Sequence, residues 1–180
     1  MIGRLTGKVY EKTPPFFILD VSGIGYLIQS PLSTFKQIKE EEEITLYTKC
    51  IFKEDEAFIY GFLTREELKI FEELISVSGV GPKSGLNLLS SFSPEEISEA
   101  IENENVELLS SVPKIGKKIA SKIILELKGK LKFDETPKLF TQAVNALCSL
   151  GISRSEALQR LKGLPQNLTL EELVKQALRK

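Results

Sequence analysis

The feature that most constrains this chain is an internal repeat. Residues 74–89 align without gaps on residues 109–124, at an offset of 35 residues. Each copy runs from an apolar helix end through a turn containing glycine to a second helix that begins near a lysine. A repeat of this kind indicates one supersecondary unit used twice. The sequence therefore predicts two helix-hairpin-helix units in tandem, and the overall fold has to hold them together.

The turns of the repeat have the chemistry of anion-binding sites. Glycine adopts positive φ easily and lets a ligand approach the backbone closely. A helix N-terminus presents unpartnered N–H groups and about half a positive charge, which suits a phosphate oxygen. Two such turns can hold phosphates on both sides of a minor groove without touching a base, so binding should ignore DNA sequence. The predicted DNA-binding residues are Gly79, Val80, Gly81, Lys83, Ser84, Lys114, Gly116, Lys117, Lys118 and Lys122.

The distribution of charge agrees with a local binding face. The net charge is only −1, so the chain has no uniformly basic coat. Residues 113–132 nevertheless contain seven lysines and one glutamate, whereas residues 95–107 contain six glutamates and no basic residue. This asymmetry predicts one cationic and one anionic face.

Several residue types that enzymes need are missing. The chain has no histidine, which excludes histidine metal sites and every nucleophile activated by histidine. The segment after Gly116 has lysine where a P-loop needs serine or threonine, so no ATP site is expected. Cys50 and Cys148 match no metal spacing and are expected to be reduced thiols of a cytoplasmic protein. We expect no cofactor, no metal, no catalytic residue and no membrane span.

The hydrophobic pattern predicts an α+β multi-domain fold. Residues 1–63 read as five short strands, typical of a small OB-fold-like barrel, with an open sheet as the alternative. Residues 64–131 should be all helix and turn and carry the tandem repeat. Residues 132–138 have the composition of a linker, and residues 139–180 predict a small three-helix (UBA-like) bundle that binds a partner. Capping-box signatures begin at Thr64, Ser93, Ser153 and Thr169, and Gly151 occupies a C-terminal cap position.

The chain as a whole resembles the RuvA family, the Holliday-junction-binding subunit of the bacterial branch-migration machine. The resemblance is carried by motifs along nearly the whole sequence. They are Met1-Ile2-Gly3-Arg4-Leu5, Gly23-Ile24-Gly25-Tyr26, Lys53-Glu54-Asp55, Tyr60-Gly61-Phe62, Gly79-Val80-Gly81-Pro82-Lys83, Ile115-Gly116-Lys117-Lys118, and the tail motif Ala146-Leu147, Leu150-Gly151 and Glu156-Ala157.

The resemblance implies a homotetramer that binds opened four-way junction DNA, as one tetramer or as two that enclose the junction. It implies that the C-terminal domain binds the RuvB-type ATPase and that the complex works with a RuvC-type resolvase. In the family, the acidic pair matching Glu54 and Asp55 forms a pin at the tetramer centre, where it repels phosphates. One departure is Lys114, which stands where the family usually has glycine and where positive φ is costly for lysine.

Two other functions remain open from the sequence. The chain is the DNA-binding fragment of a structure-specific nuclease if the acidic run 54–56 holds a divalent metal. It is a protein-interaction adaptor if the lysines are only a solvated face. Magnesium-dependent cleavage would favour the first, and function unaffected by changes at both glycine turns would favour the second.

Overall fold

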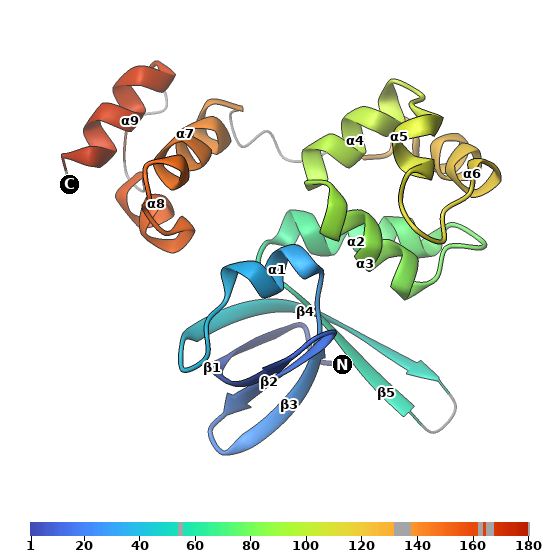
Figure 1. The fold of residues 1–180 in the computed structure, drawn as a ribbon, viewed down its shortest axis with the longest axis horizontal. Coiled ribbons are helices and arrows are strands. Elements are labelled where there is room, and N and C mark those ends of the chain that lie inside the picture. Colours follow the sequence, from blue (N-terminus) through green and yellow to red (C-terminus); the bar gives the residue numbers. More distant parts are fainter. Residues whose placement is uncertain (54–55, 132–137, 162–163, 165–167, 180) are drawn as a thin grey trace. The chain divides into compact units, whose positions relative to one another are not determined.

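The computed structural model describes residues 1–53, 56–131, 138–161, 164 and 168–179. Contacts divide the chain into two compact units, Met1–Leu131 and Lys132–Lys180. Figure 1 shows the strands and helices of both units. The strands are β1 (Arg4–Thr13), β2 (Phe16–Val21), β3 (Ile24–Gln29), β4 (Glu43–Lys53) and β5 (Glu56–Phe62). The helices are α1 (Leu32–Gln37), α2 (Arg65–Ser76), α3 (Pro82–Ser91), α4 (Pro94–Glu102), α5 (Val106–Ser110), α6 (Lys117–Leu127), α7 (Lys138–Ser149), α8 (Arg154–Leu161) and α9 (Leu170–Leu178).

The five strands close into a barrel in the order β1-β2-β3-β5-β4. The β3–β5 pair is parallel, and the other four pairs are antiparallel. Alternate side chains point inward, as the period of a strand requires. The predicted barrel is thereby confirmed, and the open sheet is wrong. The barrel core consists of Leu5, Val9, Phe17, Leu19, Ile28, Phe35, Ile38, Ile44 and Leu46.

Helix α1 was not predicted from the sequence. It has only six residues, which is too short for a helical period to be visible beside the strand pattern. Contacts with distant segments hold it in place. The Leu32 N–H donates to Ser90 Oγ at 2.8 Å, and Ser33 Oγ donates to the Leu89 carbonyl at 2.9 Å. The ring of Phe35 packs edge-on against Phe17 in the barrel core, with centroids 5.6 Å apart.

The central helices begin where the capping signatures predict. Thr64 and Glu67 form a full capping box at the start of α2. Ser93 and Glu96 form another at the start of α4. Because each box satisfies helix-end N–H groups within four residues, its position is encoded locally.

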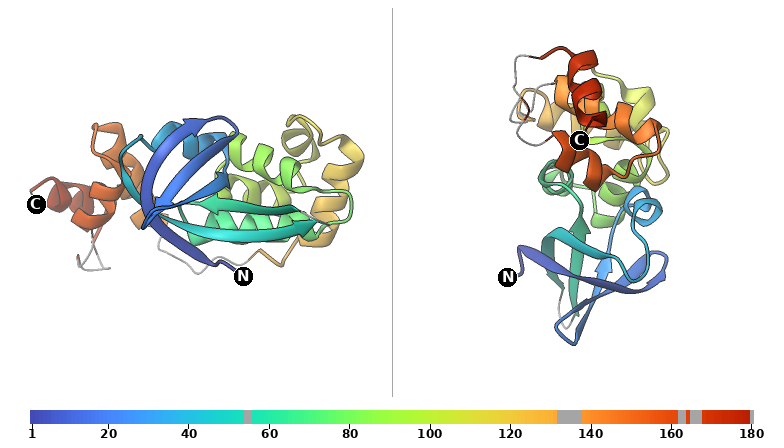
Figure 2. Two further views of the ribbon diagram at one scale, coloured as in Figure 1. Left: turned by 90° about the horizontal axis from the view of Figure 1, so that it is seen from below. Right: turned by 90° about the vertical axis from the view of Figure 1, so that its left-hand side faces the viewer.

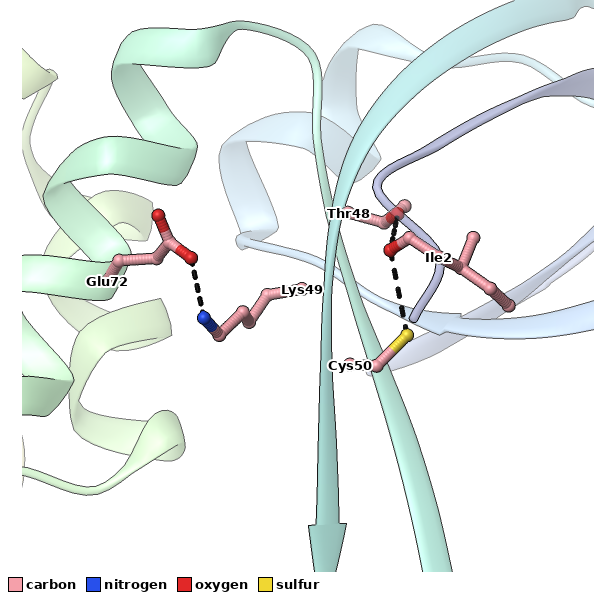
Figure 3. A network of polar contacts seen from close by, with 5 residues as sticks. All are labelled: Ile2, Thr48, Lys49, Cys50 and Glu72. Carbon is pink, nitrogen blue, oxygen red and sulfur yellow. Dashed lines mark hydrogen bonds and ion pairs between the residues drawn. The ribbon is translucent and has the colours of Figure 1, made fainter.

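The barrel and the central helices pack on each other within the first unit. Tyr60 and Phe62 on β5 lie against Phe71 of α2, with ring centroids 5.2 and 4.9 Å apart. At the edge of this contact, Lys49 Nζ on β4 donates to Glu72 Oε1 on α2 at 2.7 Å (Figure 3). The apolar stacking and the ion pair together orient the helical hairpins with respect to the barrel.

The second unit is a three-helix bundle. Its core is formed by small and branched residues on all three helices: Ala143, Val144, Leu147, Ala157, Leu161, Leu173 and Ala177. Helix α7 ends in a Schellman motif, in which the Ile152 N–H donates to the Leu147 carbonyl and Gly151 has φ of +89°. Thr169 and Glu172 form a capping box at α9, so the predicted caps at these positions are confirmed.

Two further properties concern the whole of the described chain. No helix in these residues has the length and apolarity that crossing a bilayer requires. In the same residues, no group of three or more histidine, cysteine, aspartate or glutamate side chains is arranged to hold a metal ion.

Candidate nucleic-acid interface

The sequence repeat is also a structural repeat. The first hairpin joins α2 to α3, and the second joins α5 to α6 (Figures 1 and 2). In the first turn the Val80 N–H donates to the Val77 carbonyl at 2.9 Å. In the second the Ile115 N–H donates to the Val112 carbonyl at 3.1 Å. The two bonds join equivalent positions of the aligned segments.

Backbone angles follow the same equivalence. Gly79 has φ of +96°, and its counterpart Lys114 has φ of +71°. Gly81 has φ −88° and ψ 170°, and Gly116 has φ −81° and ψ 166°. The left-handed conformation therefore falls on Gly79 and Lys114, and Lys114 adopts it despite its side chain. Gly81 and Gly116 occupy extended backbone that any residue can adopt.

The protein itself gives no steric reason for glycine at positions 81 and 116. A Cβ built on either residue meets no atom within 4 Å. Both glycines are N-cap residues, and neither helix receives a side-chain cap hydrogen bond. At the start of α3, Pro82 has no N–H and the Ser84 N–H is bonded to the Gly81 carbonyl, which leaves the Lys83 N–H open. At the start of α6 no side chain caps the N–H groups of Lys117 and Lys118, and the space in front of both helix ends is open. This is the arrangement that an approaching phosphate needs.

The lysines around the turns differ in their surroundings. Lys83, Lys114, Lys117 and Lys118 are exposed, and none has an ion-pair partner within the described residues. Lys122 faces Glu126 one helical turn away at 3.8 Å. The attraction of Lys122 for a phosphate is therefore partly offset by its neighbour, whereas the other four present their full charge.

Two predicted binding residues point inward. The side chain of Val80 is only 5% exposed, and its counterpart Ile115 is also buried. Ser84 is buried as well, and its N–H donates to the Gly81 carbonyl at 2.9 Å. Val80 and Ser84 shape the first turn from inside, and a direct contact from either to DNA stays a prediction.

One residue of this region was missed in the sequence. The Asn87 side chain on α3 donates from Nδ2 to the Pro113 carbonyl at 3.3 Å, and so ties the first hairpin to the second turn. Lys83 and Lys114 line a common hollow of about 250 Å³ beside this link. No sequence signal connects positions 26 residues apart, so only packing reveals the contact.

The acidic pair Glu54 and Asp55 lies outside the described residues. The strands that lead to it are described: β4 and β5 pair from Tyr47–Phe62 out to Lys53–Glu56. The β1–β4 register ends at Tyr47, and β3 pairs with β5 only at Ile59 and Tyr60. The outer part of this hairpin therefore extends past the barrel as a two-stranded ribbon (Figure 1).

Comparison with known proteins identifies the family. The chain is 40% identical over 192 residues to the "Holliday junction branch migration complex subunit RuvA" of Chromobacterium violaceum, covering 99% of this chain and 98% of the relative. It is 41% identical to the proteins of the same name from Bordetella avium and Neisseria meningitidis, with the same coverage of both chains. The chain belongs to the RuvA family.

Domain models agree with this assignment to the RuvA family. The RuvA N-terminal domain matches residues 1–61, which cover the barrel except for the last residue of β5. A SAM-like helix-hairpin-helix tandem matches residues 71–130, which contain both turns. The RuvA C-terminal domain matches residues 138–180, the three-helix bundle.

Proposed function

We propose that this chain is the non-catalytic subunit that binds a four-way (Holliday) junction and holds it open for branch migration in DNA recombination and repair. The observation that carries the proposal is the pair of matching turns. Each presents at least one helix-end N–H group without a side-chain cap, behind an unobstructed glycine and beside lysines that have no ion-pair partner in the described residues.

The turns contact the DNA backbone and read no base. Helix-end N–H groups bind one phosphate oxygen each, and lysines such as Lys83 and Lys117 add long-range attraction. Since phosphates and sugars are the same at every step, affinity should not depend on sequence. The protein's net charge of −1 does not prevent DNA binding, because the glutamates of residues 95–107 lie in a different segment of the sequence from the lysines of the turns.

Junction specificity arises from a tetramer, in which four copies of the β4–β5 ribbon meet. Glu54 and Asp55, which follow β4 in the sequence, then bring eight like charges to the crossover, where they repel phosphates and keep the strands apart. The described strands support this role, because their pairing continues past the barrel out to Lys53 and Glu56.

The C-terminal unit recruits the RuvB-type ATPase that drives branch migration, and the complex cooperates with a RuvC-type resolvase. Leu147 and Leu173 of this unit belong to the bundle core. Leu150 and Leu178 are 61% and 47% exposed, and Leu158 is also exposed. Exposed leucines on a small bundle favour a protein partner.

A binding comparison tests the proposal. Labelled junction, fork and duplex of equal length are titrated with the purified protein over a range of salt, and subunits are counted by sizing with and without DNA. We expect the junction to bind far more tightly than the duplex. The log–log salt slope should be about −0.9 per phosphate neutralised.

Three results would contradict the proposal. They are equal affinity for junction and duplex, a monomer on the junction, and magnesium-dependent cleavage, which would favour a nuclease. The partner site is tested separately with Leu150→Ser. This variant should keep junction affinity and lose stimulation of a RuvB-type ATPase.

A further inference from the structure

A hollow of about 250 Å³ lies between the barrel and the two hairpins. Pro14, Pro15 and Phe35 form part of its apolar wall, and it is also lined by one lysine from each hairpin region, Lys83 and Lys114. None of the described residues that line it is acidic. The hollow therefore attracts an anion, and its apolar wall suits a ligand that also has an apolar part.

Gln29, the last residue of β3, also lines this hollow and is only 9% exposed. Within the described residues its side-chain amide has no hydrogen-bond partner. The other uncharged polar residues of the hollow are all satisfied. Ser30 Oγ donates to the Gly61 carbonyl, Ser90 Oγ to the Leu86 carbonyl, and Asn87 Nδ2 to the Pro113 carbonyl.

The amide of Gln29 reaches the open hollow, because Thr34 Oγ1 is the one fully buried side-chain N or O atom without a hydrogen-bond partner in the described residues. Packing does not require an amide at position 29, because a leucine of similar size would fill the same space. The amide offers an N–H donor to a ligand in the hollow, at the same place where two lysines offer positive charge.

We infer that this hollow is a third DNA contact, in which Gln29 and the two lysines hold one sugar–phosphate unit of the strand bound by the hairpins. The phosphate accepts a hydrogen bond from Gln29 Nε2 and neutralises Lys83 and Lys114. The deoxyribose packs on Pro14, Pro15 and Phe35. The inference rests on the proposed function and extends the DNA interface from the hairpins to the barrel.

The test compares Gln29→Leu and Gln29→Glu with matched changes at Gln37. Gln37 is an exposed glutamine on α1 that does not line the hollow, and its amide donates to the Ser33 carbonyl of its own helix. Each full-length variant is titrated against a labelled four-way junction at several salt concentrations, and its thermal stability is measured.

Gln29→Leu should bind the junction about fivefold more weakly, the usual effect of one lost hydrogen bond. Its salt slope should match the wild type, because no charge changes. Its melting temperature should stay close to that of the wild type, since the amide has no hydrogen bond within the described residues to lose. A purely structural role for Gln29 would lower stability instead. Gln29→Glu should bind more weakly still, because its carboxylate repels the phosphate.

The inference would be overturned if Gln29→Leu and Gln37→Leu both bound the junction with wild-type affinity. The proposed function would then remain intact. Failure of the wild type to prefer the junction would refute the proposed function itself. A scan of single abasic sites through the junction arms distinguishes a backbone contact in the hollow from a base contact. The Gln29→Leu effect should persist at every position, and its disappearance at any position would place a base in the hollow and overturn the inference.

Discussion

Replacing Gly81 and Gly116 together with aspartate should separate DNA binding from folding. Both positions have extended backbone angles that aspartate adopts without strain, and a Cβ at either meets no atom within 4 Å. Both are N-cap positions, where aspartate is preferred over glycine by a few tenths of a kcal/mol. The double variant should therefore be as stable as the wild type or slightly more so.

The effect on DNA should be large. Each new carboxylate accepts the helix-end N–H groups and occupies the space that a phosphate would take. A hydrogen bond to a charged group contributes about 1.5–3 kcal/mol, so the loss of one at each turn costs about 3–6 kcal/mol. That corresponds to roughly 10²- to 10⁴-fold weaker binding.

The assay is fluorescence anisotropy with a labelled four-way junction, accompanied by thermal denaturation. Asn103→Asp serves as the control, because it adds one carboxylate, as each of the two glycine changes does, but at the exposed C-cap of α4 within the glutamate-rich segment. The control should bind within about twofold of the wild type. A folded double variant that keeps wild-type affinity would refute the assignment of the helix-end N–H groups to phosphates.

Further predictions concern charge, packing and pH. Lys83→Ala should reduce the log–log salt slope of junction binding by about 0.9. Lys128→Ala should leave this slope unchanged, because Glu104 already neutralises Lys128. Titrations of both variants at several salt concentrations measure the slopes. Gly61→Ala should destabilise the first unit by about 1–3 kcal/mol in chemical denaturation, since its Cβ would lie 2.6 Å from Ile28 Cγ2. Hydrogen bonds from Thr169 hold the pKa of Glu172 below its ordinary value of 4.5, so this contribution to stability is complete above that pH and is lost as the pH falls through the lowered pKa. The stability difference between wild type and Glu172→Gln should therefore shrink in acid. A difference in melting temperature that stays constant across pH would contradict this role of the Glu172 carboxylate.

Local patterns were enough to predict most of the elements and the position of the two glycine-containing turns. A capping box such as Thr64–Glu67 is complete within four residues. The repeat placed both turns in register, including the equivalence of Gly79 and Lys114 that the backbone angles bear out. Alternation of apolar residues predicted the strands, because strand geometry imposes a period of two.

The explanation of the glycines needed the structure. The sequence suggested that glycine supplies positive φ in both turns, but Gly81 and Gly116 are extended, and the positive φ falls two residues earlier. What distinguishes Gly81 and Gly116 is the open space before a helix end, and that depends on every segment packed nearby.

The sequence by itself determined the repeat, the barrel strands, the helix caps and the family, because each depends on bonds or periods spanning a few residues or on identity along the chain. Only the tertiary structure decided which lysines lack an ion-pair partner among the described residues, how α1 joins the barrel to α3, and that Gln29 lines the same hollow as Lys83 and Lys114. These properties depend on contacts between segments distant along the chain. The sequence pattern within one segment does not specify which distant segment will pack against it.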